Sequence, residues 1–427
     1  MCLLLSGCFV KTVDELYTLP RHSDAYYDLQ KALDKLMQEG MEWSAPVGGI
    51  NQQSVQLSDL DGDSEDEAIA FLRKTGENSL CVCIFDRIDG AYQNIAVIEG
   101  AGSAFFSVDY AQIDGEGGAE CIVGRQLSDQ VLQSLSVYTL TGGRVVELMS
   151  ENYTDYRTTD LDGDGLKDLF LLRFDTEQRH GVGELYRWKN GQLEREPEAM
   201  MTQGAESVKR IVTGQLMQDV PAVFVASVYD GDNILTDIFA FRDDVFCNVA
   251  ASGSDKTVQT LRSYFVYAAD IDFDGLIELP ELIPLARTQD EEDFSLIQWY
   301  NLDLYGNKKI RRTTYHSFSG GWYVEIPEPW LDSIAIQRSD EVSGVRGYSF
   351  CERIGQKQVV PIFTLYAFSG EDRTALAQSD GRVLISEKGD ISYSASIGDS
   401  RFAAELDTEA LKKMFNYIHV EWNSGET

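Results

Sequence analysis

The stretch Asp160-Leu-Asp-Gly-Asp-Gly-Leu-Lys-Asp168 places a carboxylate at positions one, three, five and nine of a nine-residue segment. Residues 59–67 and 270–278 carry the same pattern, and each segment is followed by a run of apolar residues. Alternate residues of a tight loop turn their carboxylates toward a common centre, and a hard cation such as calcium needs six to eight such oxygens. The sequence therefore predicts cation-binding loops that recur along the chain.

The acidic segments recur at a nearly constant interval. A degenerate copy occupies residues 112–120, so the first positions are residues 59, 112, 160 and 270, with intervals of 53, 48 and 110. The last interval equals two units of 55 and predicts a silent copy near residue 215, where residues 214–227 keep an apolar strand without the acids. Five units therefore extend from about residue 50 to about residue 315, and a period of this size is typical of solenoids, propellers and arrays.

Each unit has the composition of several short strands. An apolar run follows each acidic loop, as in residues 67–72, and an alternating strand such as residues 135–140 comes next. A turn with Gly or Asn, such as residues 189–191, precedes a further strand such as residues 93–98. Four short strands arranged radially around an axis satisfy this pattern and leave no long free edges. We therefore expect a mainly β chain with a β-propeller of about five four-stranded blades over residues 49–316.

The acidic loops, each preceding an apolar strand at this period, resemble the FG-GAP or VCBS repeats of integrin α-chain propellers and of many bacterial surface proteins. The resemblance covers residues 49–316 and implies that each loop joins two strands of a blade. It also implies calcium held by side chains at positions one, three, five and nine and by the backbone carbonyl at position seven. The implied ligands are Asp59, Asp61, Asp63, Glu65 and Glu67; Asp114, Glu116 and Glu120; Asp160, Asp162, Asp164, Leu166 and Asp168; and Asp270, Asp272, Asp274, Leu276 and Glu278.

Three of the loops depart from the pattern of this family. In the second loop Gln112 stands for the first Asp and Glu116 for the third, which weakens the expected calcium site. Phe273 replaces a small residue in the fifth loop. Ser64 replaces Gly in the first loop, at a position where a left-handed backbone is less comfortable for a residue with a Cβ atom.

The fifth loop also satisfies the twelve-residue EF-hand pattern, with Glu281 at position twelve. Its flanks disfavour an EF-hand, because residues 264–269 have a strand-like composition and Pro280 and Pro284 would break an exiting helix. The sibling loops also lack an acid at position twelve. We therefore expect a blade loop at this place.

The N-terminal segment Leu5-Ser-Gly-Cys8 resembles the lipobox of bacterial lipoproteins, in which the signal peptide is cut before a cysteine that then carries lipid. The charged region and most of the hydrophobic region of such a signal do not precede it, so an accidental match is the alternative. The interpretation is a signal remnant and tether over residues 1–22, lipidation at Cys8, and an extracellular protein of the cell envelope. No later segment approaches the roughly 18 to 20 apolar residues of a membrane span, so the anchor would be the only membrane contact.

Two further regions flank the repeats. Residues 23–48 are expected to form a helix and a linker, with Ser23 as a cap, Gly40 as a stop and an apolar stripe that docks on the propeller. Residues 317–427 predict a small α+β domain, whose segment Trp322–Trp330 and closing helix faintly resemble PsbP/Mog1-like domains. The stripe and the closing helix carry Leu29, Ala32, Leu33, Leu36 and Met37, and Leu411, Met414, Phe415 and Ile418, respectively. Trp322 and Trp330 are expected to pack in the core rather than stack on sugar.

The composition and motifs favour binding over catalysis. The net charge of −34 would repel nucleic acids and anionic membranes. The four histidines are widely separated, and neither a nucleophile elbow, a phosphate-binding glycine loop nor H-E-x-x-H occurs. Cys81 and Cys83 are expected as buried apolar fillers. We therefore expect a non-catalytic, calcium-stabilised surface lipoprotein that binds a protein or a glycan; the alternative is a glycan-active hydrolase or lyase with its site in the central depression of the propeller.

Overall fold

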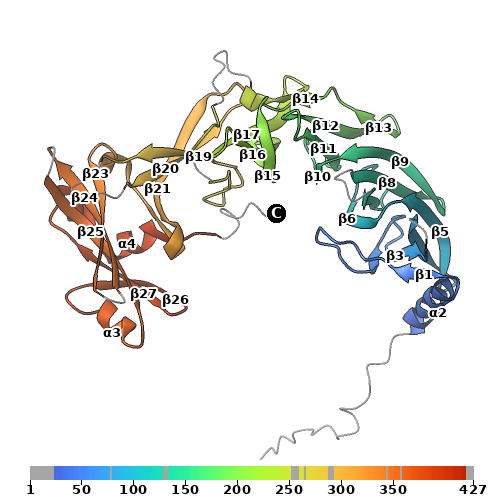
Figure 1. Ribbon diagram of the computed structural model, residues 1–427, viewed down its shortest axis with the longest axis horizontal. Coiled ribbons are helices and arrows are strands. Elements are labelled where there is room, and N and C mark those ends of the chain that lie inside the picture. The colour runs from blue at the N-terminus through green and yellow to red at the C-terminus, as the bar shows by residue number, and fades with distance from the viewer. Residues whose placement is uncertain are drawn as a thin grey trace, which may run out of the picture. The chain divides into compact units, whose positions relative to one another are not determined.

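The computed structural model describes residues 24–76, 79–127, 133–251, 259–263, 266–286, 293–342, 345–355 and 358–419. In these residues the protein is mainly β and consists of antiparallel sheets, none of which closes on itself (Figure 1). This confirms the mainly β prediction; the propeller itself stays a prediction. The proposed lipidation site Cys8, the tether and Ser23 lie outside the described residues.

The chain divides into two compact units. The first unit comprises residues 1–159, 165–173 and 185–196, and the second comprises residues 160–164, 174–184 and 197–427. The predicted domain boundary at residues 316/317 lies inside strand β21 (Lys308–Ser317), which pairs with the strands on either side of it.

Four of the sheets contain a run of four antiparallel strands in chain order. The strands are β2 (Val55–Ser58), β3 (Glu67–Lys74), β4 (Ser79–Ile88) and β5 (Ala91–Ala101); β6 (Ala104–Ala111), β7 (Glu120–Gln126), β8 (Gln133–Thr141) and β9 (Arg144–Tyr153); β10 (Asp155–Thr159), β11 (Asp168–Asp175), β12 (His180–Lys189) and β13 (Gln192–Arg195); and β15 (Ala205–Met217), β16 (Val220–Tyr229), β17 (Asn233–Arg242) and β18 (Val245–Asn248). Two short strands join them, β1 (Met41–Trp43) on β3 and β14 (Ala199–Met200) on β12.

A fifth sheet repeats the same strand order and gains one strand from the C-terminal region. Its members are β19 (Leu279–Pro284), β20 (Ser295–Leu302), β21, β22 (Trp322–Glu325) and β28 (Phe415–Tyr417). Phe415 and Ile418, expected on the closing helix, lie beyond it: helix α4 (Thr408–Met414) ends first, Phe415 begins β28, and Ile418 follows that strand. The backbone of this segment pairs with β22, and that tertiary pairing overrides the helical spacing of its apolar residues.

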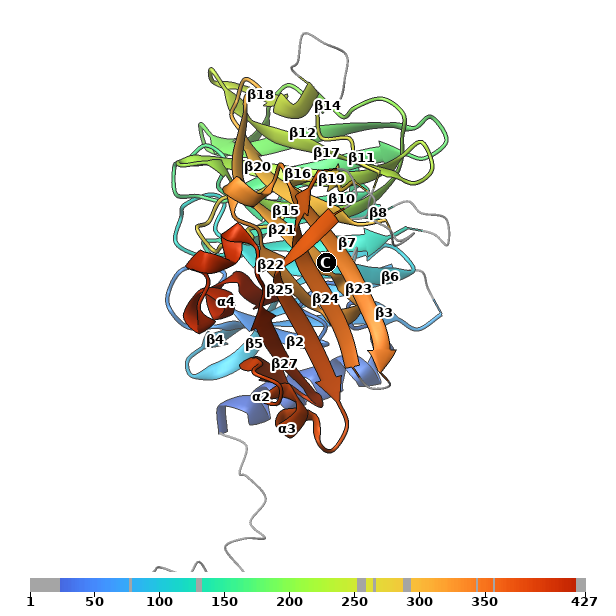
Figure 2. The ribbon, with the colours of Figure 1, turned by 90° about the vertical axis from the view of Figure 1, so that its left-hand side faces the viewer.

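The C-terminal region has its own five-stranded sheet with the order β23-β24-β25-β27-β26 (Figure 2). The strands are β23 (Ile334–Val342), β24 (Val345–Ile354), β25 (Gln358–Ser369), β26 (Val383–Lys388) and β27 (Ile391–Ile397), accompanied by helices α3 (Arg373–Ala377) and α4. The 3-10 turns of the described chain are η1 (Val249–Ala251), η2 (Phe318–Gly320), η3 (Glu328–Trp330) and η4 (Arg401–Glu405). Trp322 and Trp330 are both buried in this part of the core, as expected.

Helix α2 (Asp24–Gln38) packs on the first sheet, which confirms the predicted apolar stripe. Leu29 and Leu33 are buried, and Ala32, Leu36 and Met37 pack against the same cluster. Cys81 and Cys83 are fully buried thiols in that cluster, also as expected, and neither is in a disulfide with another described cysteine. Gly40 follows the helix with φ of +93°, a conformation that glycine adopts without the clash of a Cβ atom.

Consecutive sheets within a unit pack face to face through apolar side chains. In the first unit, the rings of Phe71 on β3 and Phe105 on β6 meet edge to face at 5.2 Å. In the second unit, Phe224 on β16 and Tyr300 on β20 belong to one buried cluster. Successive side chains of each strand face opposite sides of its sheet, which lets the apolar ones form these buried faces. The acidic loops lie at the strand ends, between the first and second strands of the first three sheets.

Candidate metal centres in the acidic loops

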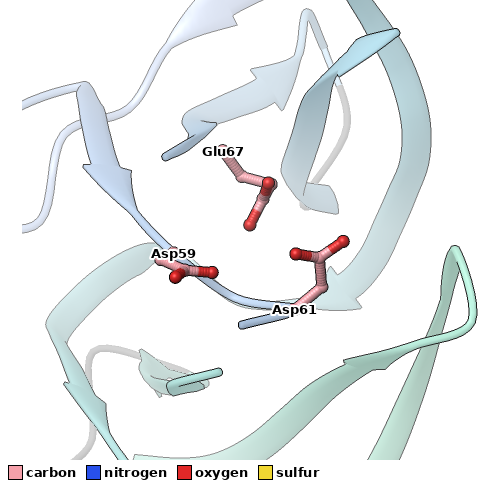
Figure 3. A group of neighbouring side chains, drawn as sticks. All are labelled: Asp59, Asp61 and Glu67. Atoms are coloured by element: carbon pink, nitrogen blue, oxygen red, sulfur yellow. The ribbon is translucent and has the colours of Figure 1, made fainter. Parts of the chain in front are cut away.

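The first loop brings three carboxylates together. Asp59 and Asp61 lie in the loop between β2 and β3, and Glu67 is the first residue of β3. One oxygen from each lies within 4.8 Å of the others, and Figure 3 shows the three carboxylates directed into the same space. Calcium–oxygen bonds of roughly 2.3 to 2.6 Å allow two ligand oxygens to lie up to about 5 Å apart. The spacing therefore fits one calcium ion.

The third and fifth loops form the same kind of group. Each contributes its first, third and ninth positions, with one oxygen per residue and all three within 4.8 Å of one another. The groups are Asp160, Asp162 and Asp168, and Asp270, Asp272 and Glu278. Three segments that share a sequence pattern thus share a geometry.

The backbone of the loops explains how they hold this geometry. The residues at positions four and six have positive φ in the first, second and third loops; in the fifth loop, positions four and six are Phe273 at +60° and Gly275 at +87°. Ser64, at position six of the first loop, has φ of +71°, so the left-handed conformation expected there is confirmed. Amide groups point inward as a result: Gly62 and Ser64 donate to the Asp59 carboxylate at 2.7 and 2.9 Å.

The carboxylate at position nine is buried in every acidic loop. Glu67, Glu120, Asp168 and Glu278 are each 3% exposed or less. Glu67 accepts a hydrogen bond from the backbone N–H of Leu60 at 2.6 Å, and Glu278 accepts one from Ile271 at 3.1 Å. This fixes one oxygen of each carboxylate. The second oxygen of Glu67, Oε1, is buried and has no hydrogen-bond partner among the described residues.

Burial raises the pKa of the Glu67, Glu120 and Glu278 carboxyls to about 7 each. Burial also raises the pKa of Asp61, and the neighbouring carboxylates of the first loop act in the same direction. An ionised carboxylate without a partner is costly to bury, so these groups either hold a proton or need a cation. The unpartnered Oε1 of Glu67 and the oxygen-only donor set both suit calcium.

Successive repeats are joined by one recurring hydrogen bond. The N–H at position eight of a loop donates to the C=O at position one of the preceding loop: Ala119 to Asp59 at 2.9 Å and Lys167 to Gln112 at 2.8 Å. The same bond runs from Ile277 to Gln215 at 2.9 Å. Gln215 is the first position of the silent copy that the interval predicts. Its carbonyl accepts the same hydrogen bond as the first positions of the first two loops, so the silent copy begins at the predicted residue.

The silent copy lacks the loop as well as its acids. Met217 pairs with Val220 across a tight hairpin, so β15 and β16 are joined by two residues where the other copies have an acidic loop. In the first three loops the position-nine residue pairs with the residue before position one, and the corresponding partner of Gly214 is Ala222, which is 1% exposed. An apolar side chain therefore fills the place that holds a carboxylate in the loops that keep their acids.

The second loop differs from the other acidic loops. Asp114, Glu116 and Glu120 do not form a group of the same closeness in the described chain. The Asp114 carboxylate instead accepts from the Thr139 hydroxyl at 3.0 Å and from the N–H of Glu116 at 2.8 Å. These three acids line a cavity of about 110 Å³ together with Asp61 of the first loop.

The predicted side-chain ligands at position five stand apart from the groups, while the backbone carbonyls at position seven stay a prediction. The Asp63 carboxylate accepts from the N–H of Glu65 at 2.7 Å, and Asp274 accepts from Leu276 at 2.9 Å. These bonds turn the position-five side chains back onto their own loops. Asp164 of the third loop is likewise absent from the group of three.

Two arginines of β21, which the sequence analysis missed, face the fifth loop. Arg312 contacts the Asp272 carboxylate at 2.6 Å, and Arg311 contacts Asp274 at 2.8 Å. Arg311 also lies 4.0 Å from Glu278. The sequence feature that could have pointed to these arginines is the run Lys308-Lys-Ile-Arg-Arg312, a basic segment in a strongly acidic chain.

The EF-hand alternative fails on the geometry after the loop. Glu278 is followed directly by strand β19, where an EF-hand requires a helix. Glu281 lies on that strand and forms an ion pair with Lys308 of β21. Its carboxylate is absent from the group formed by Asp270, Asp272 and Glu278.

No protein-family model matches the chain, and no curated protein matches it. Similar solved structures include the rhamnogalacturonan lyase YesW, with a TM-score of 0.33 and 12% identity, covering 76% of this chain and 74% of the lyase chain. The exotype rhamnogalacturonan lyase YesX has a TM-score of 0.26 and 12% identity, covering 68% of this chain and 71% of its own. Similarity at this level carries no argument about the function of this chain. Among the described helices, none has the length and apolar character needed to cross a bilayer.

Proposed function

We propose that the protein is a calcium-stabilised β-propeller with FG-GAP/VCBS-like repeats that binds a protein or a glycan without catalysis. The observation that supports this most directly is the repetition of one geometry. Three loops bring together the carboxylates of positions one, three and nine within 4.8 Å, at the intervals that the sequence predicts.

The strand order supports the propeller part of the proposal. Five sheets contain four consecutive antiparallel strands, and the sixth, formed by β23–β27, belongs to the proposed C-terminal α+β domain. Short meanders of this kind are the blades from which propellers are built. The position-eight to position-one hydrogen bond links neighbouring meanders in a constant register. Five blades follow if the meanders close around an axis.

Calcium in such loops would act on stability. The residues at positions one, three and nine would hold each ion, so an ion would fix the loop at the start of the strand that follows, as at Glu67 in the first sheet. Its charge would compensate carboxylates that burial otherwise destabilises. The proposed setting is the outside of a bacterial cell, with a lipid anchor at Cys8, because extracellular calcium is abundant enough to fill sites of moderate affinity.

The calcium proposal is tested by titrating the EDTA-treated protein with calcium and counting the bound ions by calorimetry. Asp160→Asn with Asp162→Asn should remove one ion from that count. Asp175→Asn is the matched control, because Asp175 lies outside the group and binds the amides of a turn. The absence of calcium binding at millimolar concentration would overturn the proposal.

The non-catalytic part needs a separate experiment. Incubation with a panel of neutral and acidic polysaccharides and calcium is followed for new reducing ends and for absorbance of unsaturated products. The proposal expects neither product and expects retention of the protein on one immobilised polysaccharide or on a cell-envelope protein. Products whose amount rises with the concentration of the protein would support the alternative, a glycan hydrolase or lyase.

A further inference from the structure

A pocket of about 530 Å³ lies in the C-terminal part of the second unit, away from the acidic loops in sequence. Its walls come from strands β23, β24, β25 and β27 and from the segment around η2 that leads into β22. The volume is in the range of small-molecule sites, which is roughly 300 to 1,000 Å³.

Two arginines stand on one face of the sheet that forms this pocket. Arg338 on β23 is directly opposite Tyr348 on β24, and Arg346 precedes Tyr348 by two residues on the same strand. Side chains two residues apart on a strand point to the same face, as do directly paired residues. Both arginines are exposed; Arg338 already makes a contact within the protein, whereas Arg346 makes no side-chain hydrogen bond or ion pair with another described residue.

A buried indole adds a further donor. Trp322 lines the pocket and is only 1% exposed, and its ring meets Tyr348 edge to face at 5.0 Å. Its Nε1–H makes no hydrogen bond to another described residue, so it can donate to a molecule in the pocket. The edge that carries Nε1 lies against Gly320, where an added Cβ atom would come within 2.4 Å of the nitrogen. Glycine is therefore needed for this approach.

The remaining described wall residues add hydroxyl groups and apolar surface. Besides the two arginines, the described lining consists of serine, glycine, aromatic and aliphatic residues, and none of these described residues is Asp or Glu. Tyr393 already donates to the carbonyl of Gly320 at 3.2 Å, which occupies a backbone acceptor near the indole. Arg346 and the Trp322 indole therefore leave a positive charge and a donor available in the pocket, in a chain of net charge −34, and both are complementary to an anion.

We propose that this pocket binds a small organic anion. The guanidinium groups of Arg338 and Arg346 receive its carboxylate or phosphate group, an acceptor atom of the ligand takes the hydrogen bond of the Trp322 indole, and a ring or short apolar body fills the remaining space. Arginine suits this role because its planar fork binds carboxylate and phosphate oxygens in pairs. The proposal is independent of the calcium loops and of the propeller.

The test uses the full chain with calcium present and follows the indole N–H resonance of Trp322 by NMR, assigned with Trp322→Phe. The anionic probes are phenylacetate, indole-3-acetate, glucuronate and phenyl phosphate, and the neutral counterparts are phenylacetamide, indole-3-acetamide, glucose and phenol. At least one anion is expected to shift the resonance at concentrations up to ~5 mM while its neutral counterpart does not. The carboxylate and phosphate probes identify the preferred acidic group.

Variants then assign the binding to the arginines. Arg346→Gln and Arg338→Gln should each weaken binding of the anion by about tenfold or more, as expected for loss of a charge-assisted hydrogen bond. Arg353→Gln is the matched control, because Arg353 lies on the same strand outside the lining and should bind the anion as wild type does. The proposal would be overturned if none of the four anions shifted the indole resonance or if the neutral counterparts bound equally well. It would also be overturned if Arg346→Gln bound the anion with wild-type affinity.

Discussion

The first and fifth acidic loops have the same sequence pattern but different surroundings. Both bring carboxylates of positions one, three and nine within 4.8 Å, and both bury a Glu at position nine. In the first loop the Oε1 atom of Glu67 has no partner in the described chain, and the nearest basic contact is Arg87 to Glu65 at 3.8 Å. In the fifth loop Asp272 Oδ1 is likewise buried without a hydrogen-bond partner among the described residues, but Arg312 and Arg311 contact the third and fifth positions directly.

This difference shows that a ligand pattern does not by itself define the charge of a site. The first loop leaves its negative charge for an external cation to balance. In the fifth loop two tethered guanidinium groups already balance part of it, and a calcium ion must compete with them. We therefore expect the first loop to bind calcium more tightly than the fifth, and the following experiments test that order.

The largest effect is expected from withdrawing calcium. EDTA should lower the Tm of the wild-type protein, and added calcium should restore it, because a saturating ligand stabilises the fold by about 2.7 kcal/mol per site at 100 times its Kd. Asp61→Asn should abolish more of this response than Asp272→Asn, as measured by calorimetry. Equal losses in the two variants would remove the distinction between the loops, and an unchanged Tm in EDTA would exclude calcium-dependent stability.

A second effect concerns pH in the absence of calcium. Burial raises the pKa of Glu67 to about 7 from 4.5, so the fold holds this proton at a pH where the unfolded chain has released it. The contribution of this proton to the free energy of unfolding is fully present below pH 4.5 and is lost as the pH rises through 7. The loss is at most about 3 kcal/mol. Urea unfolding in EDTA between pH 4.5 and 8 measures this slope.

Glu67→Gln isolates the contribution of that one carboxyl to the pH slope. The variant should unfold with a flatter pH dependence in EDTA and be more stable than the wild type above pH 7, yet respond less to calcium. Thr75→Ser, a conservative change in the turn directly after β3, serves as the control. A slope that survives the Glu67→Gln change would assign the pH dependence to other groups.

A third, smaller effect should come from the arginines. Arg311→Gln with Arg312→Gln should raise the calcium affinity of the fifth loop by on the order of tenfold, because competing positive charge is removed. The same variant should be less stable in EDTA. Arg87→Gln is the control in the first loop and should change calcium affinity little, since its contact with Glu65 is a surface pair. Unchanged affinity in the double variant would mean that the arginines do not compete with calcium.

The smallest effect concerns backbone strain. Phe273 is 68% exposed and has φ of +60°, a conformation that costs a residue with a Cβ atom roughly 1 kcal/mol relative to glycine. Phe273→Gly should therefore stabilise the calcium-loaded protein by about this amount in urea unfolding. Ser64→Gly should act in the same direction in the first loop. Destabilisation by Phe273→Gly would show that its contact with His419 outweighs the strain.

Much of the repeat was predictable because its determinants are local. A nine-residue loop turns its own carboxylates inward, and its interval along the chain fixes where the next copy lies, including the silent copy at Gln215. The stripe of helix α2 and the burial of Cys81 and Cys83 follow from short-range periodicity in the same way. Phe415 was misplaced because its pairing partner in β22 lies about 90 residues away, and helical spacing carries no information about that contact.

The sequence by itself determined which residues form the acidic loops, their spacing and the mainly β character of the chain, since these depend on residues close together in the chain. Only the tertiary structure decided what faces those loops. Strand β21 brings Arg311 and Arg312 to Asp274 and Asp272, about 40 residues away, and among the described residues both Glu67 Oε1 and Asp272 Oδ1 are buried without a hydrogen-bond partner. Strand register likewise decided that Arg338 pairs with Tyr348, and packing decided that the Trp322 ring lies against Gly320. Such contacts join distant segments, and the free energy of a charge depends on the groups that surround it in space.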